Sequence, residues 1–203
     1  FALVLPAAIF YGPGILHAQP WLISLVLGFL LVGSLSIEAL RFRSSSFSRI
    51  FNHCFGSMLR SVESTKLTGA TYVIGGSFFC SLIAIGGKVA AASAFLGLSL
   101  FILGDAAAAL VGKAIGRRRI GEKTLEGALG CFALCLLLAL GVFPYLPELP
   151  LVWGDIHLLQ AVFLSALVTV LELFPFRVGQ IVLNDNLYVP VVVSLAALAI
   201  HNA

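Results

Sequence analysis

Long apolar stretches separated by short polar loops constrain this chain more than any other feature. A transmembrane helix needs about 20 mostly apolar residues, and five stretches approach that length. They are residues 21–40, 67–85, 89–111, 125–143 and 156–173. Residues 1–11 look like the end of an earlier stretch, and residues 187–200, with a candidate kink at Pro190, form a shorter last one. The sequence therefore predicts an all-α fold: a polytopic integral membrane helix bundle with six to seven transmembrane helices.

The composition supports a lipid environment for a single domain covering residues 1–203. Apolar residues make up 60% of the chain and charged residues 10%, whereas ordinary soluble domains contain about 25% charged residues. The chain begins with Phe1 inside an apolar run, so we expect an N-terminal piece to be missing. No basic region has interleaved aromatic residues, so nucleic acid is not an expected partner. The sequence does not indicate an oligomeric state.

The basic residues indicate how the bundle lies in the membrane. All of the 12 lysines and arginines except Lys88 fall in alternate loops, at residues 41–66, 113–124 and 174–186. The positive-inside rule makes that side cytoplasmic. We therefore expect a multi-pass membrane protein whose active site is on the cytoplasmic face. Residues 11–14 and 144–150 are predicted to be turns because of their glycine and proline content.

An amphipathic helix is predicted within the first basic loop. Apolar residues recur there at helical spacing with polar residues between them, which suits a helix lying in the cytoplasmic membrane interface. It would serve either as a lid over a site or as a plain connector. Its apolar positions are Phe47, Ile50, Phe51, Cys54, Phe55, Met58, Leu59 and Val62.

Two carboxylates lie within or at the end of apolar stretches, where charge is costly. An ionised side chain at the bilayer centre costs at least ~2.5–3.5 kcal/mol, so such a residue normally faces the bundle interior and has a partner. Asp105 precedes Lys113 by about 12 Å of helix, and Glu172 ends an apolar stretch. We interpret both as candidate functional residues, with a structural hydrogen bond as the alternative. Glu38 is explained by pairing with Arg41.

The loop at residues 113–124 and its flanks have the composition of a phosphate-binding segment. Glycines let the backbone pass close to a ligand, and lysines and arginines neutralise phosphate oxygens. A threonine can cap the next helix, whose N-terminus attracts anions. A positively charged cytoplasmic loop without a ligand is the alternative. The candidates are Gly112, Lys113, Gly116, Arg117, Arg118, Lys123 and Thr124.

Two further polar stretches are predicted to reach the same face. One is an Asn-Asp-Asn sequence whose oxygens suit Mg²⁺, although the same residues also favour turns and helix starts. The other leads into a helix start that contains glycine. The residues concerned are Asn184, Asp185 and Asn186 in the first stretch, and Glu63, Lys66 and Thr68 in the second.

Four motifs, taken in order, resemble those of a known family. They are RSVESTKLTGATY at residues 60–72, GDAAAALVGKAIG at 104–116, EKTLEG at 122–127, and LNDNLYVP at 183–190 with Glu172 upstream. The set is similar to the motifs of the integral-membrane, CTP-dependent lipid alcohol kinases. That family comprises dolichol kinase, phytol and farnesol kinases, and the yeast-type CTP-dependent diacylglycerol kinase. The chain differs at Ala106, where members usually have proline.

The resemblance implies Mg²⁺-dependent transfer of the γ-phosphate of CTP to the hydroxyl of a membrane lipid alcohol, such as a polyprenol, dolichol, phytol, farnesol or diacylglycerol. It implies catalytic roles for Asp105, Glu172 and Asp185. The implied Mg²⁺ ligands are Glu63, Asp105, Asn184, Asp185 and Asn186. The implied nucleotide- and phosphate-binding residues are Arg60, Lys66, Thr68, Gly112, Lys113, Gly116, Arg117, Arg118, Lys123, Thr124 and Glu126.

Other functions remain as alternatives. A CTP-dependent phosphatidate cytidylyltransferase would use the same donor, metal and membrane face, and would make a CDP-lipid. A small ion-coupled transporter would use Asp105 and Glu172 as ion sites. Transporters, however, tend to place charges near the midplane and to contain internal repeats, and this sequence shows no repeat. An inert scaffold would not need buried carboxylates.

Overall fold

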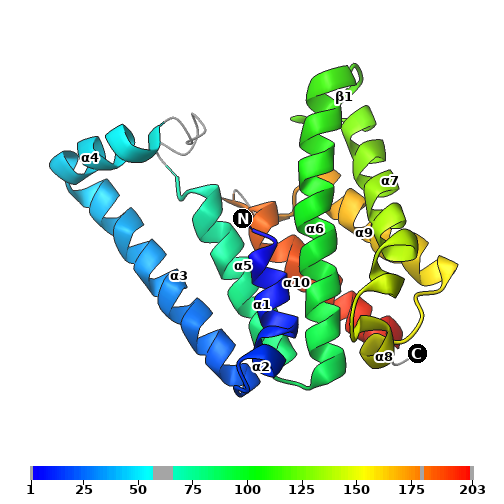
Figure 1. The fold of residues 1–203 in the computed structure, drawn as a ribbon. Coiled ribbons are helices and arrows are strands. Elements are labelled where there is room, and N and C mark those ends of the chain that lie inside the picture. The colour runs from blue at the N-terminus through cyan, green and yellow to red at the C-terminus, as the bar shows by residue number, and fades with distance from the viewer. Residues whose placement is uncertain (1, 57–65, 179–180, 202–203) are drawn as a thin grey trace.

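The structure, a computed structural model, describes residues 2–56, 66–178 and 181–201 (Figure 1). It consists of helices joined by turns and two short hairpins. The helices are α1 (Val4–Phe10), α2 (Gly12–Ile15), α3 (Pro20–Arg43), α4 (Ser45–Phe55), α5 (Gly69–Ala84), α6 (Lys88–Ile115), α7 (Leu125–Gly141), the 3₁₀ helix η3 (Phe143–Tyr145), α8 (Leu149–Trp153), α9 (Leu158–Leu173) and α10 (Asp185–His201). The strands are β1 (Arg119–Ile120), β2 (Lys123–Thr124), β3 (Arg177–Val178) and β4 (Ile181–Val182).

Each predicted apolar stretch coincides with a helix. Among the described residues, three helical segments are long and apolar enough to cross a membrane: Pro20–Arg43, Lys88–Ile115 and Leu125–Tyr145. The helices α5, α9 and α10 are apolar but shorter, with 16, 16 and 17 residues. α10 continues through Pro190. The chain is therefore a mainly helical protein with candidate membrane-spanning helices.

The two segments predicted as turns are partly helical. Residues 12–15 form α2, and residues 144–150 contribute to η3 and α8. All three elements carry proline at their first or second position. Proline suits that place because its fixed φ is already helical and its missing N–H would have no partner there. The glycine and proline content therefore marks helix starts here as well as chain reversals.

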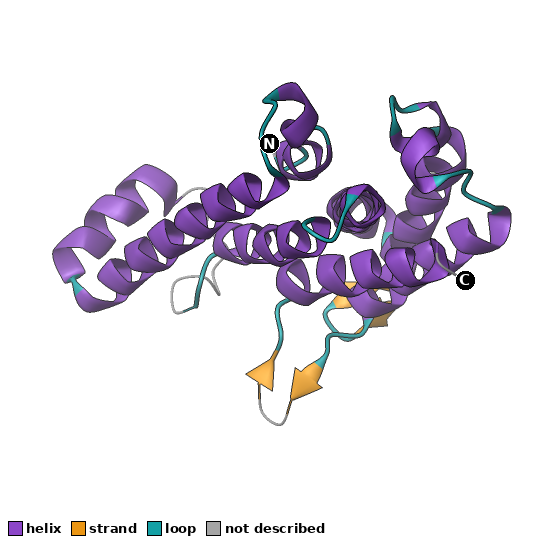
Figure 2. Cartoon of the chain, turned by 90° about the horizontal axis from the view of Figure 1, so that it is seen from below, coloured by secondary structure: helices purple, strands orange, loops and turns teal. Residues whose placement is uncertain are grey.

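Helix α6 lies within the bundle and packs against α1, α5, α7 and α10 (Figures 1 and 2). Its middle is almost completely buried, with Leu96, Leu98 and Leu100 exposing 1% or less of their surface. Alanines and glycines on the same helix allow neighbouring backbones to come close, which is how helices associate tightly when lipid offers no hydrophobic driving force. α6 thereby fixes the relative positions of the helices around it.

A close backbone approach between α6 and α10 occurs at Gly97. A Cβ atom at this residue would lie 2.6 Å from the backbone nitrogen of Ser194 and 2.8 Å from its Cα. Nearer the start of α10, a Cβ at Gly76 of α5 would lie 3.1 Å from Cγ of Pro190 and would also collide with the Asn186 carbonyl oxygen. α10 therefore packs closely against both α5 and α6 at glycine positions.

Two antiparallel hairpins add small strands to the predicted all-α fold. In the first, Arg119 lies opposite Thr124 and Ile120 opposite Lys123, which leaves a two-residue loop that begins at Gly121. Gly121 has φ +63°, a left-handed conformation that glycine adopts without a steric cost. This hairpin joins α6 to α7, and the second, β3–β4, joins α9 to α10. The hairpins thus connect helix ends that lie at the same end of the bundle.

We expect Gly97→Ala to destabilise the protein by about 1–3 kcal/mol, because the added methyl group would overlap backbone atoms that cannot move independently of α10. The measurement is the thermal unfolding midpoint of the purified protein in detergent. Gly33→Ala on α3 is the matched control, since a Cβ there would meet no described atom within 4 Å. Equal midpoints for the two variants would contradict the close contact between α6 and α10.

Candidate functional site

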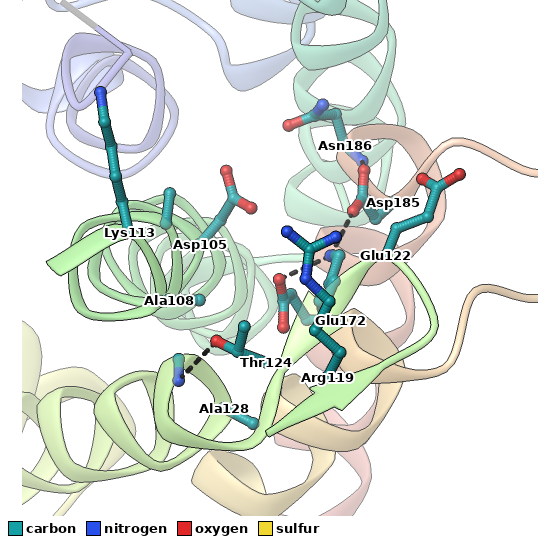
Figure 3. Close-up of a pocket in the computed structure, with 14 residues that line it drawn as sticks. Asp105, Ala108, Lys113, Arg119, Glu122, Thr124, Ala128, Glu172, Asp185 and Asn186 are labelled. Atoms are coloured by element: carbon teal, nitrogen blue, oxygen red, sulfur yellow. Dashed lines mark hydrogen bonds and ion pairs between the residues drawn. The ribbon is translucent and has the colours of Figure 1, made fainter. Parts of the chain in front are cut away.

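A polar cavity of about 310 Å³ lies where five elements end or begin (Figure 3). The C-terminal part of α6, the β1–β2 hairpin, the start of α7, the end of α9 and the start of α10 all contribute to its wall. Three of these elements follow one another in the chain, and the packing of α10 against α6 and of α9 against α7 brings the other two beside them. The lining residues are Asp105, Ala108, Ala109, Gly112, Lys113, Arg119, Glu122, Lys123, Thr124, Gly127, Ala128, Glu172, Asp185 and Asn186.

Lys123 is at the centre of the charged network in this cavity. Its Nζ donates to Oε1 of Glu172 at 2.5 Å and to Oδ2 of Asp185 at 2.9 Å. The side chain of Glu172 is 3% exposed, whereas those of Lys123 and Asp185 are each 26% exposed. A carboxylate buried to this degree needs a cation beside it. The bridge therefore ties the first hairpin to the end of α9 and the start of α10.

Lys123 is a permanent positive charge in this setting. Burial by itself lowers the pKa of the Lys123 ammonium group, but the negative charges of Asp185 and Glu172 and the hydrogen bonds to them outweigh that effect. The net result is a pKa above the ordinary lysine value. Lys123 consequently remains protonated at neutral pH and can hold either the two carboxylates or an incoming anion.

Asp105 faces the same cavity from α6. Figure 3 shows its carboxylate projecting toward the side where Asp185 and Glu172 lie, while Lys113, two turns further along α6, points away from that pair. The prediction that Asp105, Glu172 and Asp185 gather at one place thus agrees with the geometry. Three carboxylates from three helices contribute to one cavity wall.

Thr124 and the glycines near it form a tight joint between α6 and α7. The Thr124 hydroxyl accepts a hydrogen bond from the backbone N–H of Gly127 at 3.1 Å, which is the predicted helix cap. A Cβ at Gly112 would lie 2.7 Å from the Thr124 hydroxyl oxygen, and a Cβ at Gly116 would lie 2.9 Å from it. The small size of these glycines is therefore required by Thr124, and Gly112 also lines the cavity.

Glu126 binds backbone instead of facing the cavity. Its carboxylate accepts hydrogen bonds from the backbone N–H of Arg117 at 3.1 Å and of Arg118 at 3.2 Å. Within the described part of the chain, these three residues and Gly116 are not among those that line the cavity. Glu126 therefore fixes the backbone that follows α6 through these hydrogen bonds.

The Asn-Asp-Asn sequence divides into a cap and two cavity residues. The side-chain oxygen of Asn184 accepts a hydrogen bond from the backbone N–H of Asn186 at 3.0 Å, next to the start of α10. Asp185 and Asn186 line the cavity. The turn-and-cap alternative therefore describes Asn184, and the oxygen-ligand interpretation fits the other two positions.

The donor set suits Mg²⁺ only if other ligands complete the coordination. Within residues 2–56, 66–178 and 181–201, no group of three or more His, Cys, Asp or Glu side chains is close enough to hold a metal ion. Mg²⁺ in phosphate-processing sites is commonly bound by one or two carboxylates together with substrate phosphates and waters. The oxygens of Asp105, Asp185 and Asn186 fit such a site, in which substrate phosphates and waters supply the remaining ligands. Glu63, another predicted ligand, lies outside the described residues.

Lys66 and Thr68 belong to a separate polar cluster between α3 and α5. Arg41 forms an ion pair with Glu38 at 2.7 Å, as predicted, and donates to the Lys66 carbonyl oxygen at 2.6 Å. The Thr68 N–H donates to Glu38 at 2.8 Å, and the hydroxyl of Thr71 donates to the same oxygen at 3.3 Å. Neither Lys66 nor Thr68 is among the residues described as lining the cavity. Arg60, predicted to bind phosphate with them, lies outside the described residues.

Arg119 and Glu122 line the cavity but were not among the sequence candidates. Both belong to the first hairpin, and Figure 3 shows the Arg119 guanidinium directed toward Asp185 and Glu172. A two-residue strand has too few positions to show alternation, so periodicity could not reveal it. The available signal was Gly121 followed by a polar residue, which is a composition typical of a two-residue hairpin loop.

A comparison with known proteins found no match: no family model, no curated protein and no solved structure matches this chain. The four motifs therefore remain a resemblance.

We expect Lys123→Met to destabilise the protein by about 2 kcal/mol, because it leaves the Glu172 carboxylate buried without its cation. Adding Glu172→Gln should recover much of this loss by removing the uncompensated charge. Thermal unfolding in detergent measures both effects. Lys66→Met, which removes an exposed ammonium group elsewhere, is the control and should change stability by less than about 0.5 kcal/mol. Additive losses in the double variant would contradict the bridge.

Proposed function

We propose that this protein is a lipid alcohol kinase that transfers the γ-phosphate of CTP to the hydroxyl of a membrane alcohol. The observation that carries this proposal is the convergence of Asp105, Glu172 and Asp185 with Lys123 and Arg119 on one cavity at the ends of apolar helices. Carboxylates suit a phosphate-bound Mg²⁺, and cations suit the phosphates themselves. The resemblance in sequence supports CTP as the donor and a lipid alcohol as the acceptor.

The proposed membrane arrangement has six to seven spans, in which α5, α9 and α10 cross together with the three longer candidates. The cavity then lies on the cytoplasmic side, together with the basic loops. Asp105 is ten residues from the end of α6 at Ile115, which corresponds to about 15 Å of helix. That depth suits an acceptor whose hydroxyl enters at the membrane surface while its chain stays among the helices.

In the proposed reaction the hydroxyl oxygen of the alcohol bonds to the γ-phosphorus of CTP, and the bond from that phosphorus to the β-phosphate oxygen breaks, which releases CDP. Phosphoryl transfer depends mainly on positioning and on neutralising charge. Lys123 and Arg119 hold phosphate oxygens, and Glu172 or Asp105 accepts the hydroxyl proton. Mg²⁺, held by Asp105 and Asp185 with the phosphates, supplies further neutralisation of charge when it is bound.

Two other functions would use the same cavity differently. A phosphatidate cytidylyltransferase would join the lipid phosphate to the α-phosphate of CTP and release pyrophosphate. An ion-coupled transporter would need the carboxylates on a path through the protein, whereas Lys123 joins two of them at one end of the bundle. The kinase is favoured over the transporter because cations and carboxylates line the same cavity.

We expect the purified protein, with Mg²⁺ and γ-radiolabelled CTP, to transfer label to at least one member of a panel of phytol, farnesol, polyprenol and diacylglycerol. Asp105→Asn and Asp185→Asn should each lower the rate by about 10²-fold or more, because each removes a charge that acts on the transferring phosphate. Glu148→Gln, far from the cavity, is the matched control and should keep full activity. Full activity of Asp105→Asn would contradict the proposed role of that carboxylate.

Product analysis separates the kinase from its nearest alternative. The kinase yields CDP and a lipid phosphate, whereas a cytidylyltransferase yields pyrophosphate and a CDP-lipid. Formation of a CDP-lipid from phosphatidic acid, without label transfer from the γ position to any alcohol, would replace the kinase proposal.

A further inference from the structure

Helix α4 occupies an unusual position at the edge of the molecule. It follows α3 after the single residue Ser44, whose hydroxyl caps it by accepting from the Phe47 N–H at 3.3 Å. None of its eleven residues, all of which the structure describes, is buried. Figures 1 and 2 both show α4 beside the end of α3, away from the α6–α10 part of the bundle. Since α3 is long and apolar enough to span a bilayer, α4 begins where such a span leaves the hydrocarbon.

The apolar face of α4 is only partly covered by the protein. The ring of Phe51 turns toward α3, with its centroid 5.2 Å from the guanidinium carbon of Arg41. Ile50 remains 63% exposed and Phe55 remains 51% exposed. Apolar side chains that project from an amphipathic helix at the membrane boundary are suited to insertion among acyl chains.

The flank beside this apolar face is cationic. Arg49 and His53 lie one helical turn apart and, with Ser46 and Ile50, border an open hollow. Arg43 is also exposed, at the end of α3. Residues 39–56 contain no aspartate or glutamate, so nothing in this segment offsets the positive charge. An apolar face with a purely basic flank matches a surface that combines acyl chains with negative headgroups.

We propose that α4 docks in the headgroup layer of a leaflet containing anionic phospholipid, where Ile50 and Phe55 enter the acyl region and Arg49 meets lipid phosphate groups. The proposal rests on α3 spanning the membrane, which is part of the proposed membrane arrangement, and it does not depend on phosphoryl transfer. A symmetric contact between α4 helices of two copies would bring like charges together, because residues 39–56 contain basic but no acidic residues.

A native cysteine provides the test. Cys54 lies on the apolar side of α4 and is exposed, whereas Cys80, Cys131 and Cys135 are buried, so a maleimide fluorophore of the environment-sensitive NBD type should label Cys54 in the folded chain. The labelled full chain is placed in nanodiscs of phosphatidylcholine, or of an equal mixture with phosphatidylglycerol, at one copy per disc. We expect blue-shifted emission and stronger quenching by spin-labelled lipids in the anionic discs.

Two variants and a matched control sharpen this experiment. Arg49→Gln should lower the preference for anionic discs about fivefold, which is the factor expected for one arginine at an anionic surface. Ile50→Ser should reduce quenching in both disc types, with an unchanged unfolding midpoint because Ile50 is exposed. Lys88→Gln removes the same charge at the other end of the molecule and should leave the Cys54 signal unchanged.

Three outcomes would overturn the proposal. One is equal quenching in neutral and anionic discs. Another is an equal effect of Arg49→Gln and Lys88→Gln. The third is a blue shift that occurs only when a disc holds two copies, which would assign the face to self-association. None of these readouts measures phosphoryl transfer, so failure here and failure of the kinase proposal are distinguishable.

Discussion

The ion pairs from Lys123 to Glu172 and Asp185 are the interaction on which the candidate site depends. They connect residues 49 and 62 positions apart in the chain and join a hairpin to the ends of two helices. Glu172 is nearly inaccessible to solvent, and an ionised carboxylate in that situation is tolerated only beside a cation. The groups that hold the elements together are therefore the same groups that give the cavity its charged lining.

The position of this network follows from the close packing of the helices. Gly97 and Gly76 let α10 lie close to both α6 and α5, and Gly112 admits the Thr124 hydroxyl at the joint between α6 and α7. Small residues at these contacts bring the helix backbones together. The cavity occupies the space where the helices end and the hairpin starts. A rigid apolar bundle thus supports a polar site at one end, as preorganised binding requires.

Much of the helical arrangement and part of the site could be predicted from local patterns. The lengths of the apolar stretches predicted where the main helices lie. Thr124 was predicted to be a helix cap because it directly precedes a long apolar run. Arg119 and Glu122 were missed because a two-residue strand leaves no periodic trace. Arg117 and Arg118 are predicted phosphate ligands by composition, but of the three adjacent arginines it is Arg119 that lines the cavity. Composition does not reveal which of several adjacent arginines faces inward.

The sequence by itself indicated a lipid environment and the positions of the main helices. A chain with so few charged residues forms apolar helices, and the few carboxylates within those helices can be recognised as candidates for function. Only the tertiary structure decided which polar groups meet. Asp105, Lys123, Glu172 and Asp185 surround one cavity, whereas Thr68 pairs with Glu38 in another cluster. The reason is physical. Helix formation depends on neighbouring residues, but the partner of a buried charge is set by how distant helices pack, and that depends on small-residue contacts far from the charge itself.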